Sequence, residues 1–140
     1  KSRFVHLEFF ILNEDQEGLG KKGDVLGLEV NMRPAGGFTP EMYNYSQETD
    51  VYKIWADMIA FDYNTKNIGN SHYCAFYGRR DGKSYKFDDY EIMSKYGDKM
   101  VMWGRIPEAL SGAMANQMYV ANFDTEEEMM AFYPDLAVTY

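Results

Sequence analysis

Apolar and polar residues alternate near the N-terminus, and this period of two predicts β-strands. In residues 28–33, apolar side chains at 28, 30 and 32 alternate with Glu29, Asn31 and Arg33. The three polar side chains should therefore stand in a row on one face, about 7 Å apart. Pro34 ends the strand pattern because proline has no N–H to donate.

An earlier segment, residues 4–12, is apolar on both faces and predicts a buried central strand. Glu8 lies in its middle, and a polar, glycine-containing connection (13–24) leads to the second strand, as in a long hairpin. Antiparallel pairing would bring Glu8 near Glu29 on one face. His6 could face the same site, although a single strand histidine is more often structural.

Two neighbouring carboxylates suggest a cation site. A buried carboxylate is costly unless paired, and neither strand segment (4–12 or 25–32) contains Lys or Arg. A divalent cation shared by Glu8, Glu29 and Asn31 would offset that cost. Arg33 suits phosphate oxygens. The alternative is an ordinary strand with a solvated polar face and a Gly-rich turn after it.

These residues resemble a known family. The sequence from His6 to Phe10, a hairpin and then residues 28–37 is similar to the end of the catalytic domain of ATP-grasp enzymes. That superfamily includes biotin carboxylases, carbamoyl phosphate synthetases, D-alanine ligases and L-amino-acid ligases. The resemblance implies that Glu8, Glu29 and Asn31 bind Mg²⁺ or Mn²⁺. It also implies a catalytic Arg33 at the terminal phosphate.

The resemblance implies an ATP-dependent ligase that joins a small-molecule carboxylate to an amine or a thiol through an acyl phosphate. The backbone N–H groups of Gly36 and Gly37 would cradle an anion. ATP-grasp enzymes place a substrate domain and nucleotide-binding lysines before this hairpin, and residues 1–140 contain neither. We therefore expect a fragment, inactive alone, whose partner is the remainder of its own polypeptide. A homodimer stays open, as does a non-catalytic binding module with an ATP-grasp-like fold.

The next segments predict two helices and a boundary. Thr39 and Pro40 have the features of a helix start, as N-cap and first helical residue, and that helix should end near Gln47 with Met42, Tyr43 and Tyr45 packed. Residues 51, 54, 55, 58 and 59 form the apolar stripe of a core-facing helix. The polar stretch 62–71 predicts a boundary between domains at 1–62 and 71–140.

The remaining residues predict an α+β lobe, so that the whole chain is α+β, an antiparallel sheet with packed helices. The expected elements are strands at 72–77 and 84–87 joined by a turn at 80–83, a helix after Asp88 that ends at Gly97, a strand at 100–105, a loop at 106–116, a strand at 117–123 and a helix opening at 124–128. The acidic residues at 124–128 have capping-box spacing and are interpreted as helix caps.

Net charge and composition limit the kinds of partner that this chain can have. The net charge of −8 argues against a nucleic-acid partner, and no apolar run approaches the roughly 20 residues of a transmembrane helix, so no membrane partner is expected. The basic cluster Arg79, Arg80, Lys83 and Lys86 is interpreted as a solvated hairpin tip. The single cysteine, Cys74, reads as a buried strand residue and fits a reducing compartment, so we expect a cytoplasmic location.

Overall fold

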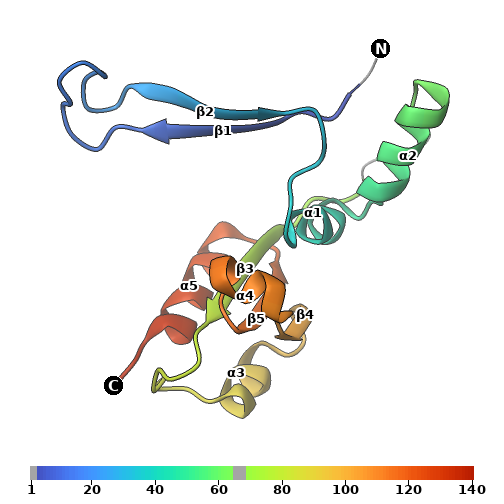
Figure 1. Ribbon diagram of the computed structural model, residues 1–140. Helices are drawn as coiled ribbons and strands as arrows, with labels where there is room; N and C mark the ends of the chain where they lie inside the picture. The colour runs from blue at the N-terminus through green and yellow to red at the C-terminus, as the bar shows by residue number, and fades with distance from the viewer. Residues whose placement is uncertain (1–2, 65–68) are drawn as a thin grey trace. The chain divides into compact units, whose positions relative to one another are not determined.

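The computed structural model describes residues 3–64 and 69–140, and these form an α+β protein with two antiparallel sheets and five helices (Figure 1). The predicted class is therefore confirmed at this level. None of the helices in the described residues is long and apolar enough to cross a membrane.

The chain divides into two compact units. The first combines Lys1–Gly36 with Tyr52–Thr65, and the second combines Gly37–Val51 with Lys66–Tyr140. This division differs from the expected domains because residues 37–51 belong with the C-terminal unit. The expected boundary stretch, 62–71, contains residues 65–68, which lie outside the described residues.

The first unit contains the predicted hairpin. Strands β1 (His6–Ile11) and β2 (Val25–Asn31) pair antiparallel, as the alternation predicts. A bulge after Glu8 shifts the register by one residue, so that Phe9 lies opposite Gly27. The backbone N–H of Leu12 donates to the carbonyl of Asp24 over 3.0 Å and continues the ribbon beyond β1.

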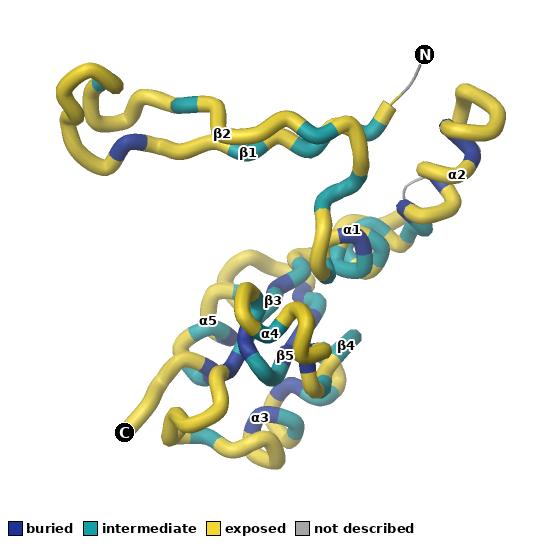
Figure 2. Tube along the Cα trace, in the orientation of Figure 1, coloured by how far each residue is buried: buried dark blue, intermediate teal, exposed yellow. Residues whose placement is uncertain are grey.

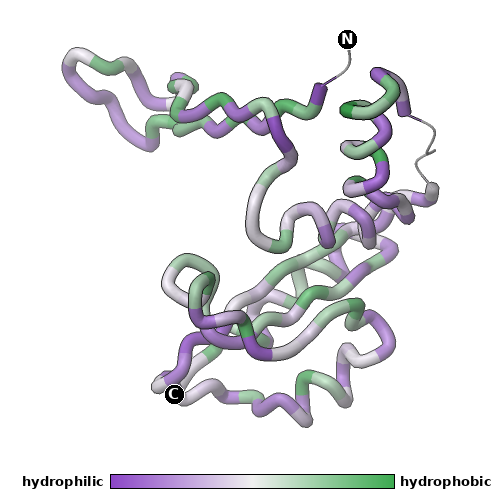
Figure 3. Tube along the Cα trace, turned by 45° about the vertical axis from the view of Figure 1, so that its right-hand side comes forward, coloured by the Kyte–Doolittle hydropathy of each residue, from purple (hydrophilic) through white to green (hydrophobic). Residues whose placement is uncertain are grey.

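The expectation that β1 is buried is wrong for the described chain. In β1, Phe9 is 55% exposed, Phe10 57% and Ile11 72%. Most of the β1–β2 ribbon has the colour of exposed residues (Figure 2). The physical reason is that a two-stranded ribbon has no second layer over either face. Along this ribbon hydrophobic and hydrophilic segments follow one another closely (Figure 3).

Two helices follow the hairpin in sequence, α1 (Thr39–Gln47) and α2 (Val51–Phe61). In α1, Pro40 stands in the first turn as predicted and is buried, but Phe38 is the N-cap and no side chain caps the helix. The predicted packing of α1 is only partial, since Tyr43 remains 46% exposed. The apolar stripe of α2 is also only partly buried. Its members at 51, 54 and 58 are buried, whereas those at 55 and 59 are exposed.

The second unit is built on a three-stranded antiparallel sheet in the order β3-β5-β4. The strands are β3 (Tyr73–Arg79), β4 (Met100–Arg105) and β5 (Gln117–Phe123). The central strand β5 is buried along most of its length, which its position between two neighbours explains. Helices α1 and α5 (Glu126–Ala137) pack against β3 and β5.

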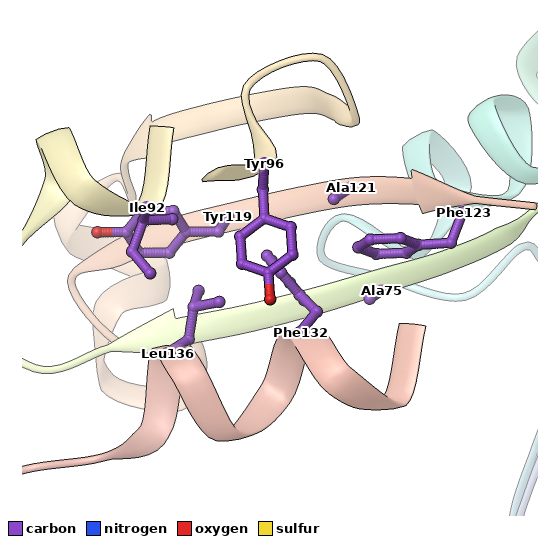
Figure 4. Packing of buried hydrophobic residues seen from close by; sticks show 8 residues of the cluster. All are labelled: Ala75, Ile92, Tyr96, Tyr119, Ala121, Phe123, Phe132 and Leu136. Carbon is purple, nitrogen blue, oxygen red and sulfur yellow. The ribbon is translucent and has the colours of Figure 1, made fainter. Parts of the chain in front are cut away.

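The core of this unit lies between the sheet, α3 (Asp89–Tyr96) and α5 (Figure 4). Its buried members are Ala75, Ile92, Tyr96, Tyr119, Ala121, Phe123, Phe132 and Leu136. The Tyr96 and Phe132 rings meet edge to face with centroids 5.1 Å apart, a favoured aromatic geometry. Helix α3 follows Asp88, as predicted, and Asp88 and Glu91 form a capping box with both hydrogen bonds present.

Two predictions in this unit are wrong. The expected loop at 106–116 contains a helix, α4 (Glu108–Met114), which begins after Pro107. The expected return strand at 84–87 does not pair with β3, because its backbone groups bond to the C-terminal residues: Lys86 N–H donates to the carbonyl of Val138, and Tyr140 N–H donates to that of Ser84. Tyr85 forms an isolated bridge with Thr139 instead.

Candidate functional site

The two carboxylates of the predicted site are direct neighbours. Glu8 and Glu29 are opposite partners in the β1–β2 register, one residue before the bulge. Directly opposite residues in an antiparallel pair point to the same face, with Cβ atoms about 4.5–5.5 Å apart. Like charges at such positions repel and are destabilising. The sequence-predicted proximity of the two carboxylates is confirmed.

His6 and Asn31 complete a polar cluster with Glu8 and Glu29. They are themselves register partners, two residues along each strand, so the four side chains share one face. The Nε2 atom of His6 lies 3.4 Å from Oε1 of Glu8. Within the described residues, Nδ1 of His6 and Nδ2 of Asn31 are buried and have no hydrogen-bond partner.

The charge of this polar cluster is not balanced by lysine or arginine. In residues 3–64 and 69–140, no Lys or Arg forms an ion pair with Glu8 or Glu29. The expected burial of the carboxylates is only partial, since the Glu8 side chain is 40% exposed and Glu29 is also exposed. Water therefore lowers the desolvation cost, and mutual repulsion is the remaining electrostatic problem of the pair.

The donor set suits a cation that brings other ligands with it. Among the described residues, no group of three His, Cys, Asp or Glu side chains could hold a metal ion alone. Magnesium usually takes one or two protein carboxylates together with waters and substrate phosphates. Glu8, Glu29 and the amide oxygen of Asn31 are the types of oxygen ligand that such an incomplete set requires.

Arg33 lies just outside the strand. Because β2 ends at Asn31, alternation along the ladder does not fix the face of Arg33, contrary to the strand expected over 28–33. Its Nη1 donates to the carbonyl of Pro34 over 2.9 Å. Within the described ranges it forms no ion pair, so its charge is available to an anion.

The two glycines after Arg33 differ in their surroundings. Gly36 ends the first unit, and a Cβ there would meet nothing within 4 Å. Gly37 begins the second unit with φ +62°, and a Cβ there would lie 2.8 Å from Sδ of Met114. The positive φ and the nearby Met114 side chain therefore favour glycine at 37 without any ligand. The predicted anion cradle at these glycines stays a prediction.

In the basic cluster Arg80, Lys83 and Lys86 are exposed, as the sequence suggested, but Arg79 is not. Arg79 is only 5% exposed. It donates to the carbonyls of Leu136, Phe87 and Asp135 over 3.1, 2.8 and 3.4 Å. The sequence pattern missed this role because an arginine at a strand end is usually solvated. The available signal was its alternation with Tyr77 and Ala75 on the core face of β3.

Cys74 and His72 do not form a reactive pair. Burial raises the pKa of the Cys74 thiol to about 11, which disfavours the nucleophilic thiolate. The His72 ring contacts carboxylates instead, with Nε2 3.2 Å from Glu48 and Nδ1 3.7 Å from Asp124. Cys74 lies in β3 but is only partly buried, so the predicted buried strand residue is confirmed in part.

Comparison of the chain with protein-family models, with curated proteins and with solved structures finds no match.

Proposed function

We propose that this chain supplies the metal- and phosphate-binding hairpin of an ATP-grasp ligase, which joins a carboxylate to an amine or a thiol. One observation carries the proposal: Glu8 and Glu29 are opposite partners, and Asn31 shares their face. The resemblance of residues 4–37 to the ATP-grasp metal-binding strands assigns these positions to that chemistry.

Each polar residue has a role in this proposal. Glu8, Glu29 and Asn31 would hold Mg²⁺ or Mn²⁺, which when bound neutralises charge on phosphoryl oxygens. His6 holds one oxygen of Glu8, at 3.4 Å, and so limits the orientation of that carboxylate. Arg33 is exposed and without a carboxylate partner in the described residues, so it can bind the terminal phosphate of ATP.

The apolar side chains of the hairpin support a larger catalytic domain. β1 and β2 expose large apolar groups on the face opposite the polar cluster, including Leu7, Phe9 and Val30. Exposed apolar surface of this kind marks a binding face. In this proposal the nucleotide-binding part of the ligase covers it, and that part also supplies the nucleotide-binding lysines.

The test is turnover by the ligase that contains this chain. ADP release is measured with Mg²⁺-ATP and a panel of amino acids as carboxylate and amine substrates. We expect Glu29→Gln to abolish ADP release, because a neutral amide is a poorer ligand for a hard cation. The control Glu17→Gln, in the exposed hairpin connection, should leave it unchanged. Equal turnover in Glu29→Gln and the unsubstituted protein would overturn the proposal.

A further inference from the structure

A second site candidate lies in the second unit, away from the hairpin sequence. An open cavity of about 620 Å³ is located at one end of the sheet, where Arg79, Gln117 and Arg105 are register partners across β3, β5 and β4. These partners point to one face. The loop after β3 and the start of α3 form the other walls. Small-molecule sites have about 300–1,000 Å³, so the cavity has the volume of a ligand site.

The inner wall of this cavity is rigid because Arg79 ties the loop to the core. Arg79 is buried and donates to carbonyls of α5 and of Phe87. Its guanidinium carbon lies 4.4 Å from the Tyr85 ring centroid and 5.3 Å from that of Tyr119. Cation–π contacts of this kind add to the hydrogen bonds and hold Tyr85 against the cavity.

The outer wall of the cavity is fixed by hydrogen bonds to α4 and to β4. The Arg80 guanidinium donates to the carbonyls of Ser111 and Gly112 over 2.6 and 2.9 Å. Asp81 accepts two hydrogen bonds from Arg105, at 2.7 and 2.6 Å. The loop after β3 is thus fixed on both sides. Ligand binding to a preformed cavity of this kind costs less free energy, because little has to be ordered.

The charge of the cavity is opposite to that of the chain. It is lined by four cations, Arg79, Arg80, Lys83 and Arg105, and by three carboxylates, Asp81, Asp88 and Asp89, in a chain with a net charge of −8. Arg105 forms an ion pair with Asp81, and Nη1 of Arg79 lies 3.9 Å from Oδ1 of Asp89. In the described part of the chain, Arg80 and Lys83 have no carboxylate partner.

Of the three carboxylates in the cavity, Asp89 accepts hydrogen bonds from the central strand β5. Asp89 accepts one hydrogen bond from the Tyr119 hydroxyl and one of 3.3 Å from the Gln117 amide. Burial, and then the Asp89 hydrogen bond, raise the pKa of Tyr119 to about 12, so its hydroxyl stays a donor. Tyr90 lines the same cavity and is 81% exposed.

We infer that this cavity binds a small organic anion that carries an aromatic ring. Lys83 and Arg80 take the anionic group, and Tyr85 and Tyr90 contact the ring. The inference is independent of the ligase proposal, because every residue that carries it lies in the second unit.

The probe is phenyl phosphate, titrated into the ¹⁵N-labelled 140-residue chain while amide shifts are followed, with inorganic phosphate and phenol as separate arms. We expect saturable shifts at residues 80–90 and 117–119 with a Kd of about 1 mM or tighter. Either half of the probe alone should bind more weakly. Inorganic phosphate that binds as tightly as phenyl phosphate would overturn the inference, and so would the absence of saturable shifts.

Two exposed substitutions test the assigned contacts without disturbing the core. Lys83→Glu should weaken phenyl phosphate binding at least about threefold, since an exposed ion pair becomes a repulsion. Tyr90→Leu should weaken phenyl phosphate more than inorganic phosphate. The matched controls are Lys22→Glu, which changes the net charge equally, and Tyr140→Leu, which removes a tyrosine that is 90% exposed. Equal losses in variant and control would contradict the assignment.

Discussion

Glu8 and Glu29 lie directly opposite each other across the β1–β2 hairpin, and no lysine or arginine of the described residues pairs with either carboxylate. A hairpin gains nothing from such a pair on its own, because like charges at opposite positions repel. The arrangement has a physical purpose if a cation occupies the face that the two carboxylates share with Asn31.

The first prediction follows from this repulsion. In the presence of EDTA, Glu29→Gln should leave the hairpin equally stable or stabilise it, by about 1 kcal/mol at most for a solvated pair. Amide hydrogen exchange over β1 and β2, together with urea unfolding, provides the measurement. Glu17→Gln is the control for the change in net charge. A clear loss of protection in Glu29→Gln alone would mean that Glu29 is a structural residue.

The second prediction concerns the buried Arg79. Arg79→Met should destabilise the protein by about 2–4 kcal/mol, because three carbonyls lose their donor and Asp89 loses the cation 3.9 Å away. The matched control Arg33→Met, at an exposed position, should change stability by no more than about 0.5 kcal/mol. Urea unfolding compares the two. If Arg79→Met and Arg33→Met both changed stability by no more than about 0.5 kcal/mol, Arg79 would be a solvated residue and the prediction would be wrong.

The third prediction concerns the reactivity of the Cys74 thiol. With a pKa of about 11, Cys74 has only about 0.1% thiolate at pH 8, whereas an unfolded cysteine has roughly a quarter. Reaction with a disulfide reagent should therefore be slow in the folded protein, speed up steadily between pH 8 and 10, and become fast in denaturant. A folded rate equal to the denatured rate would show that Cys74 is exposed and activated.

The fourth prediction is a pH dependence in the second unit. The hydrogen bond from Lys95, and then that from Tyr96, lower the pKa of the Asp135 carboxyl. A lowered folded pKa means that its stabilisation is present above the ordinary carboxyl pKa and is lost as the pH falls through the folded value. Asp135→Asn should therefore reduce stability at pH 7, and progressively less as the pH falls below the ordinary carboxyl pKa. The control Asp98→Asn, at an exposed position, should show no such difference.

Sequence patterns were most reliable where one local rule decides the structure. The alternation at 28–31 predicted that Glu29 and Asn31 share one face of the hairpin, because pleat geometry is local. Asp88 predicted the start of α3, because helix capping is local as well. The helix α4 was missed because Ser111 and Gly112 favour loops, although a seven-residue helix tolerates both. Propensity is a weak guide over so short a segment.

The missed features depend on partners distant in sequence. Segment 84–87 carries the pattern of a return strand, but its backbone groups bond to residues 138 and 140 near the C-terminus. The burial of Arg79 likewise depends on α5, more than fifty residues later. At the hairpin, the carboxylate neighbours were predictable, whereas their partial solvation was not, because burial depends on what covers a strand.

The most direct test of the metal site is paramagnetic broadening by Mn²⁺ in the ¹⁵N-labelled chain. With millimolar Mn²⁺, amide signals of residues 6–8 and 29–31 should broaden first, reversibly and weakly, since Mg²⁺-type sites are completed by substrate phosphates. Addition of excess Mg²⁺ should restore the signals, and Glu8→Gln with Glu29→Gln should abolish the selectivity. Broadening that is unselective, or that persists in the double variant, would contradict the metal site.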